Sequence, residues 1–225
     1  MSEESFIREV DEELRSDQVR KFWDRYKWLV IGVAVSIIAL TAGYNFWKSY
    51  SESVAGASGD RFLAAVALSA DGKHEEAITE LEALGKDGAG EYPALARIRL
   101  AAEYARQGAV DQAVEAFDEI SSDNGFDETL RQVAQLRAGL LLVDHGDYDE
   151  VAKRLEPLAA IGESFRHSAR EGLGLSAWKQ GDLQKAHRWF TEIAQDILAP
   201  GGIRTRAGVM LDLLSGKGIT ASEES

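Results

Sequence analysis

The residues best suited to chemistry are histidines and carboxylates, but their spacing forms no recognisable catalytic or metal site. No two histidines stand at positions i and i+4, which would place two imidazoles on one helix face. The sequence also contains no cysteine, no Gly-Lys-Ser/Thr phosphate loop and no Gly-x-Ser-x-Gly elbow. We therefore expect no catalytic residue, no metal site and no cofactor, and a protein that is not an enzyme. The four histidines are His74, His145, His167 and His187.

Two groups of neighbouring carboxylates could in principle transfer protons. Glu75 and Glu76 form the first group, and Asp147, Asp149 and Glu150 form the second. Both groups fall in the predicted first turn of a helix, where the helix dipole stabilises negative charge by roughly 0.3–1 kcal/mol. Capping of helices is the interpretation that we prefer, and a hydrolase with an unrecognised carboxylate site is the alternative.

One local cluster of basic residues stands in an otherwise acidic region, and it consists of Arg166, His167 and Arg170. A solvated helix face explains most such clusters, and a patch for an acidic partner is the alternative. Nearby, Gly172 and Gly174 lie inside a predicted helix and follow no strand, so they indicate close helix packing rather than dinucleotide binding.

These residues are carried by two very different parts of the chain, the first of which is a membrane span. Twenty consecutive residues, 28–47, contain no Asp, Glu, Lys or Arg. At about 1.5 Å of rise per residue they cover roughly 30 Å, the thickness of a bilayer core. Aromatic side chains flank both ends, as is typical of membrane interfaces. These residues are Trp23, Tyr26 and Trp28, then Tyr44, Phe46, Trp47 and Tyr50.

The charges beside the span predict its direction. Lys48 is the one basic residue that follows the span before Arg61, whereas five stand close before it in the leader 1–27, namely Arg15, Arg20, Lys21, Arg25 and Lys27. We therefore expect a single-pass protein with a cytoplasmic N-terminus. The pattern of the leader predicts an amphipathic helix that could bind to membrane lipid. From Lys48 onward, 19 basic and 30 acidic residues give a charge of −11, which excludes nucleic acid as a partner.

Beyond residues 48–60, predicted as a linker or a helix extension, the sequence repeats itself. Gly72, Gly108, Gly146 and Gly181 fall 36, 38 and 35 residues apart, each followed by a polar helix start. Glycine is favoured after a helix end because it adopts left-handed backbone angles without steric cost. Each glycine thus predicts the turn of a helical hairpin. Gly216 lies a further 35 residues on and predicts a half-unit over 203–214.

Positions at fixed distances from these glycines share a character. Seven residues before each glycine stands a small residue, where two helices would approach closely. Nine and twelve residues after it stand large apolar residues, which would give the second helix one buried face. The small residues are Ala65, Ala101, Gly139 and Gly174; the large ones are Leu81, Phe117, Leu155 and Phe190, then Leu84, Ile120, Leu158 and Ile193.

This spacing resembles the tetratricopeptide repeat, whose unit is a helix-turn-helix of about 34 residues. The turns at His145-Gly146-Asp147-Tyr148 and Lys179-Gln180-Gly181-Asp182 carry the resemblance most clearly. It implies an all-α fold, with a right-handed solenoid of about four hairpins plus a capping helix over 61–216 and a flexible acidic tail over 217–225. Such repeats bind proteins.

In the repeat frame, a mostly apolar set of first-helix residues points toward the concave face. An apolar face favours an amphipathic helix or apolar segment of a partner over a terminal carboxylate or a small-molecule substrate. An error of one residue in the position of a helix would move these side chains from the concave face into the packing between helices. We therefore regard a role in the core between helices as an equal alternative. The set is Phe62, Val66, Leu95, Ile98, Ala102, Val133, Leu136, Leu140, Val143, Leu175 and Trp178.

The order of leader, span ending near Tyr44-Asn45-Phe46-Trp47, and repeats with a Tyr92-Pro93-Ala94 helix start resembles the ancillary Sec-translocon subunit family (YfgM-like). The resemblance implies a bacterial inner-membrane protein with a periplasmic repeat domain. Its partners would be the Sec translocon and periplasmic chaperones, and its function the passing of exported chains between them. A scaffold for envelope or cell-wall assembly is the alternative.

Overall fold

The computed structural model describes the backbone of residues 3–220 and the side chains of residues 25–220. Over that range the fold is all-α, with nine α-helices, one short 3-10 helix and no strand. Residues 221–225 of the predicted tail lie outside the described residues, as do the side chains of the leader before Arg25. The elements are α1 Glu3–Ala70, α2 His74–Asp87, α3 Tyr92–Arg106, α4 Val110–Ser122, α5 Glu128–His145, α6 Tyr148–Leu155, η1 Pro157–Ala159, α7 Arg166–Lys179, α8 Leu183–Gln195 and α9 Gly201–Gly216.

The chain divides into two compact units, Met1–Val54 and Ala55–Ser225. Helix α1 runs through the division, and residues 48–60 are helical throughout. Its N-terminal part contains one segment long and apolar enough to cross a membrane, with a mean hydropathy of 1.9 and no buried residue. A core helix of a soluble protein would bury such a segment, whereas Trp28, Leu40 and Phe46 are each about three-quarters exposed here.

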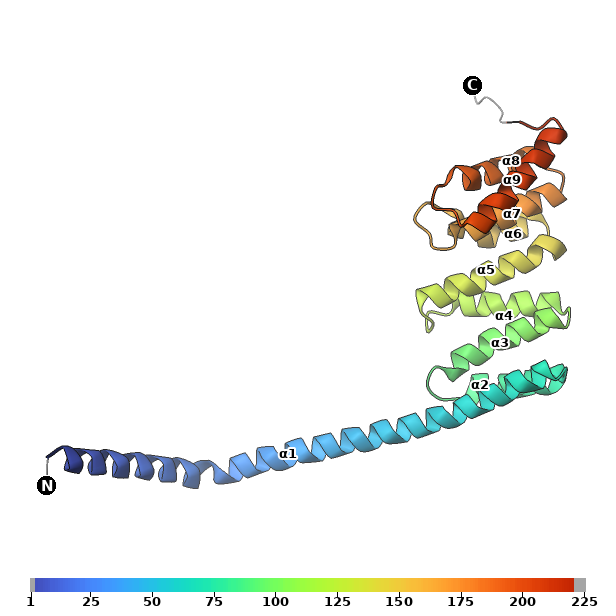
Figure 1. Ribbon diagram of the computed structural model, residues 1–225. Helices are drawn as coiled ribbons and strands as arrows, with labels where there is room; N and C mark the ends of the chain where they lie inside the picture. Colours follow the sequence, from blue (N-terminus) through green and yellow to red (C-terminus); the bar gives the residue numbers. More distant parts are fainter. Residues whose placement is uncertain (1–2, 221–225) are drawn as a thin grey trace. The chain divides into compact units, whose positions relative to one another are not determined.

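The second unit is a stack of hairpins, formed by the end of α1 with α2, then α3 with α4, α5 with α6, and α7 with α8 (Figure 1). Helix α9 follows and packs on α8 and α7. From α2 onward each α-helix contacts the next along the chain, and α5 also contacts α7. The end of α1 meets α2 through a hydrogen bond from Arg61 to Glu80. The expected four hairpins and capping helix are therefore confirmed.

The turn glycines confirm most of the spacing argument. Gly72, Gly108 and Gly181 have φ values of 80°, 76° and 81°, in the left-handed region expected of them. Gly146 differs, since its φ is −106° and its N–H donates to the carbonyl oxygen of Leu142. A Cβ atom there would lie 2.7 Å from Glu150 Oε2 and 3.0 Å from Leu142 Cδ2, so a larger residue would have to displace the ends of these side chains. The expectation of a left-handed turn at this position was wrong.

The last hairpin position also differs from the expected one. Gly216 is the final residue of α9 rather than the turn glycine, and Gly218 adopts the left-handed φ of 79°. Helix α9 therefore begins before Ile203, at Gly201, and extends past Leu214.

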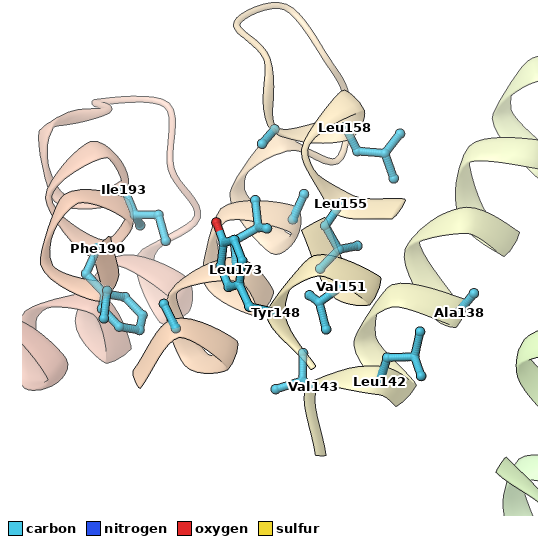
Figure 2. Close-up of a cluster of buried hydrophobic side chains, with 14 of the residues drawn as sticks. Ala138, Leu142, Val143, Tyr148, Val151, Leu155, Leu158, Leu173, Phe190 and Ile193 are labelled. Carbon is cyan, nitrogen blue, oxygen red and sulfur yellow. The ribbon is translucent and has the colours of Figure 1, made fainter. Parts of the chain in front are cut away.

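The small and large positions meet in the core. A Cβ atom on Gly139 would lie 2.6 Å from Leu155 Cγ, and one on Gly174 would lie 2.8 Å from Phe190 Cζ. All eight large apolar residues predicted from the repeat are at most 3% exposed. Figure 2 shows the part of this core that Val151, Leu155, Leu173 and Phe190 share. Hairpins at this spacing therefore bury a large apolar core from α3 to α9 and a smaller cluster around Leu81 and Leu84 at the start of the stack.

Helix α6 is the shortest α-helix of the described chain, with 8 residues. It ends before Pro157, which has no backbone N–H to continue the helical ladder and begins η1 instead. Leu158 is still buried, so the apolar period of the repeat survives the change of helix type.

Candidate partner-binding groove

Helices α5 and α7 form an open groove whose lining is mainly apolar. Its volume is about 430 Å³. Leu140 and Val143 of α5 stand three residues apart and so share a helix face, as do Leu175 and Trp178 of α7. Leu140 is 39% exposed and Leu175 is 36% exposed, whereas Val143 is nearly buried at the base. We refer to these four residues as the α5–α7 groove.

Glycine in α7 allows the two helices to approach. A Cβ atom on Gly172 would lie 2.6 Å from Leu155 Cδ1 and 3.0 Å from Leu140 Cδ2. This confirms the close helix packing predicted at Gly172. A larger residue there would push Leu140 away from α7 or separate the helices.

Charged side chains border one end of the α5–α7 groove. The Lys179 ammonium donates hydrogen bonds to the carbonyl oxygens of Val143, at 3.3 Å, and of Asp144. These carbonyls belong to the last turn of α5, where a cation is favoured by the helix dipole. The Lys217 ammonium lies 5.6 Å from the centre of the Trp178 ring, within range of a cation–π interaction. The lysines thus hold one end of the groove in place.

The other predicted inner-face residues are spread through the stack and do not line this groove. Phe62 packs on the buried cluster around Leu81, with its ring 6.2 Å from that of Tyr92. Ile98 and Leu136 pack against the main core, and Leu95 is 42% exposed at another place. Val66, Ala102 and Val133 are partly exposed as well. Core packing and groove lining therefore both occur within the predicted set.

The basic cluster is engaged by carboxylates of the same chain. Asp196 accepts hydrogen bonds from Arg166 at 3.0 Å and from His167 at 2.8 Å. Arg170 donates to the carbonyl oxygen of Ala159 and lies 3.3 Å from Glu192. The Arg166 guanidinium, the Leu198 N–H and His167 together hold the pKa of the Asp196 carboxyl far below its usual range.

This pairing leaves little free positive charge for an acidic partner. Arg170 and His167 are buried, and the side chain of Arg166 is 15% exposed. Both arginines border a surface hollow of about 910 Å³ that also contains Trp189. Binding of an acidic partner at this cluster stays a prediction.

The sequence argument missed a buried carboxylate in α3. Glu103 is fully buried, accepts a hydrogen bond from Ser69 at 2.6 Å, and lies 2.8 Å from Arg99 and 3.2 Å from His74. Burial raises the pKa of this carboxyl, but the hydrogen bonds from Ser69 and His74 and the charges of Arg99 and Arg106 outweigh burial and lower it. Glu103 thus joins the end of α1, the start of α2 and α3.

Of the two predicted carboxylate groups, the one around Asp147 caps its helix, whereas Glu75 and Glu76 lie in the first turn of α2, whose N-terminus has no side-chain cap hydrogen bond. Asp147 Oδ1 accepts a hydrogen bond from the Glu150 N–H at 2.8 Å, and Glu150 Oε2 accepts one from the Asp147 N–H at 3.2 Å. This reciprocal pair is a capping box. Within residues 25–220, no three His, Cys, Asp or Glu side chains are grouped to hold a metal ion.

Comparison with known proteins gives one match. The sequence matches the family described as tetratricopeptide repeat-like domain over residues 20–210, a range that includes the apolar span and nearly all of the stack. No curated protein and no solved structure matches the chain.

Proposed function

Since the chain belongs to the tetratricopeptide repeat-like family, we propose that it is a membrane-anchored adaptor whose α5–α7 groove holds an apolar or amphipathic segment of a partner. The observation that carries this proposal is an open groove with a mainly apolar lining, in which Leu140 and Leu175 are each more than a third exposed. Repeat folds of this kind serve as surfaces for binding other proteins.

The groove favours a modest affinity. Fully burying a leucine contributes about 1.5–3 kcal/mol, so covering the exposed third of Leu140 and of Leu175 contributes roughly 0.5–1 kcal/mol each. Trp178 adds a rigid aromatic wall of the kind enriched among residues that dominate binding energy. The sum is a few kcal/mol, which is too little for tight binding in dilute solution.

Anchoring compensates for weak contacts. A helix in the bilayer confines the groove to a thin layer near membrane-bound partners and raises their effective concentration. The basic residues before the span favour a cytoplasmic N-terminus and a stack on the opposite face of a bacterial inner membrane. In that topology the stack is periplasmic.

The partners that we propose are the Sec translocon and periplasmic chaperones, with exported chains passing between them. The order of leader, span and repeats supports this choice through its resemblance to ancillary Sec-translocon subunits. A chain leaving a membrane channel exposes apolar segments, which is the chemistry that the α5–α7 groove fits.

Crosslinking in native membranes tests the proposal. A photoreactive amino acid replaces Leu175 in the full chain, and a matched variant carries it at Glu115, an exposed position of α4 outside the groove. We expect subunits of the Sec channel or periplasmic chaperones to be crosslinked from position 175 and not from 115. Recovery of cell-wall assembly proteins alone would contradict the export role, and equal yields from both positions would contradict the groove.

A further inference from the structure

The segments that connect successive hairpins all lie at one end of the stack. Antiparallel helices place every second connection on the same side (Figure 1). Helix α1 begins its part of the stack at this end, because a Cβ atom on Gly90 would lie 3.2 Å from the Cβ atom of Ala55, where the second unit starts. We refer to this end as the loop end. Its connecting segments are 88–91, 123–127, 156–165 and 196–200.

The chain joins the loop end to the membrane span. Ala55 is the eighth residue after Trp47, where the apolar span ends. Eight residues reach at most roughly 30 Å even when they are fully extended. The proposed anchor therefore keeps the loop end close to a bilayer surface, whereas the turns within the hairpins lie at the opposite end of the stack.

Two neighbouring segments of the loop end expose large apolar side chains. Ile161 is 92% exposed, Ile197 is 85% exposed and Leu198 is 71% exposed. The two segments are neighbours, because Arg166 at the end of one donates a hydrogen bond to Asp196 at the start of the other. Large apolar side chains that gather on a surface mark a contact with a protein or a membrane. We refer to Ile161, Ile197 and Leu198 as the apolar tips.

The sequence around the apolar tips carries no charge. No Asp, Glu, Lys or Arg occurs over 157–162 or over 197–203, although 28% of the chain is charged. The tips can therefore enter a lipid layer without taking an unpaired charge with them. The other two segments of the loop end differ, because one carries Glu91 and in the other Phe126 has its ring 4.8 Å from the Arg97 guanidinium.

The segment between α8 and α9 has backbone groups that are already hydrogen-bonded. Arg204 donates to the carbonyl oxygens of Ile197, at 3.3 Å, and of Ala199, at 2.7 Å. The Leu198 N–H donates to Asp196 Oδ1 at 2.9 Å. Unpaired backbone groups are costly in an apolar layer, so this pairing suits a segment that contacts lipid.

We propose that the loop end docks on the bilayer that holds the span, with the apolar tips inserted at the boundary of headgroups and acyl chains. This inference rests on the membrane anchor of the proposed function, but capture by the α5–α7 groove does not require it, since the span alone confines the groove. The ligand is lipid because the tips lie at the end of the stack that the anchor holds near the bilayer. The charge of −11 from Lys48 onward repels anionic lipid, so apolar insertion drives the contact.

Fluorescence quenching in vesicles without any other protein tests the contact. The natural sequence contains no cysteine, so a single introduced thiol carries the label. The full chain is reconstituted into phosphatidylcholine vesicles in which some lipids carry a nitroxide on the upper acyl chain. Ile197→Cys reports the loop end, Gln180→Cys is the matched control at the exposed opposite end of α8, and Leu40→Cys reports the span. We expect quenching at position 40, and at least about tenfold more quenching at 197 than at 180, the ratio of docked to undocked chains that roughly 1.4 kcal/mol maintains.

A second pair of variants tests insertion of the apolar tips. Ile161→Glu together with Leu198→Glu, at positions that are exposed in the stack, should lower quenching at 197 about tenfold, because charged side chains enter the apolar layer at a large cost. Gln107→Glu, at the opposite end, should leave it unchanged.

The possible outcomes separate the docking from the anchor. Equal quenching at 197 and 180, with strong quenching at 40, would overturn the docking and leave the anchor standing. Absence of quenching at 40 would overturn the anchor, and the docking with it. Protection of position 197 from a thiol reagent in native membranes, without quenching in vesicles, would indicate a protein contact and overturn the lipid contact.

Discussion

The contact between Gly174 and Phe190 gives the sharpest test of how the stack is held together. In Gly174→Ala, the new methyl would lie 2.8, 3.0 and 3.1 Å from three atoms of the Phe190 ring. Carbon atoms prefer separations of about 3.5–4.0 Å, and overpacking of this kind costs about 1–3 kcal/mol. Alanine also favours the helix by about 1 kcal/mol relative to glycine. The net result is a loss of roughly 0–2 kcal/mol.

The ring is the cause of this loss, so its removal should reverse the sign. In a Phe190→Leu background, the same Gly174→Ala change should stabilise α7 by up to about 1 kcal/mol, through helix propensity alone. The coupling between the two substitutions is then about 1–3 kcal/mol, within the range measured for residues in contact. Gly208→Ala is the matched control, because its methyl would meet nothing within 4 Å and should stabilise α9 in either background.

Hydrogen exchange of α7 and α8 peptides in the full chain, held in detergent, measures the free energy of local opening for each variant. A local measurement is preferable because repeat arrays can lose cooperativity on unfolding. If Gly174→Ala stabilised α7 equally with and without the Phe190 ring, the proposed close packing of α7 on α8 would be refuted.

Three further substitutions test individual interactions. Glu103→Ala removes the fully buried carboxylate that Ser69, His74 and Arg99 share, and it should destabilise the first hairpins by about 1–3 kcal/mol, measured by hydrogen exchange of α1 and α3 peptides. The pKa of Asp196 is lower in the folded protein than in the unfolded chain, where an aspartate has a pKa of about 4. Its ion pairs therefore stabilise the fold fully above about pH 4, and this stabilisation is lost as the pH falls from there toward the folded-state pKa. Asp196→Asn should flatten this acid dependence in urea unfolding curves from pH 2 to 6, and an unchanged slope would contradict the assignment. Asp147→Ala removes the cap of α6 and should cost about 1 kcal/mol, and unchanged exchange of α6 amides would argue against the capping box.

Much of the fold follows from local rules that a sequence displays. A glycine at Gly72, Gly108 or Gly181 predicts a turn because few other residues adopt its backbone angles. Helical spacing predicts burial of Leu155 and Phe190 because the same period repeats in every hairpin. Gly146 is the exception. Its place in the regular spacing predicts a left-handed turn, but its φ is −106°.

The details of the surface depend on contacts between distant residues. Asp196 neutralises Arg166 from a loop 30 residues later, and no local pattern indicates that pairing. The pair Arg99 and Glu103 stands at i and i+4 and could have been noticed, but its burial depends on Ser69 from α1. The residues that line the α5–α7 groove could not be predicted from local sequence for the same reason. The packing of α5 against α7 determines which of their apolar side chains remain exposed.

Capture of a partner by the α5–α7 groove is the central claim, and one substitution in that groove tests it most directly. Leu175→Glu places a charge where an apolar segment would lie, on a side chain already 36% exposed, so the stack should stay folded. Ile197→Glu makes the same change at an exposed loop position and serves as the control. The measurement is the amount of partner recovered with the full chain after chemical crosslinking of native membranes. The account predicts at least about a tenfold loss for Leu175→Glu and none for Ile197→Glu, since an unpaired buried charge costs more than 1.4 kcal/mol. Equal recovery from a folded Leu175→Glu variant and from the natural chain would contradict it.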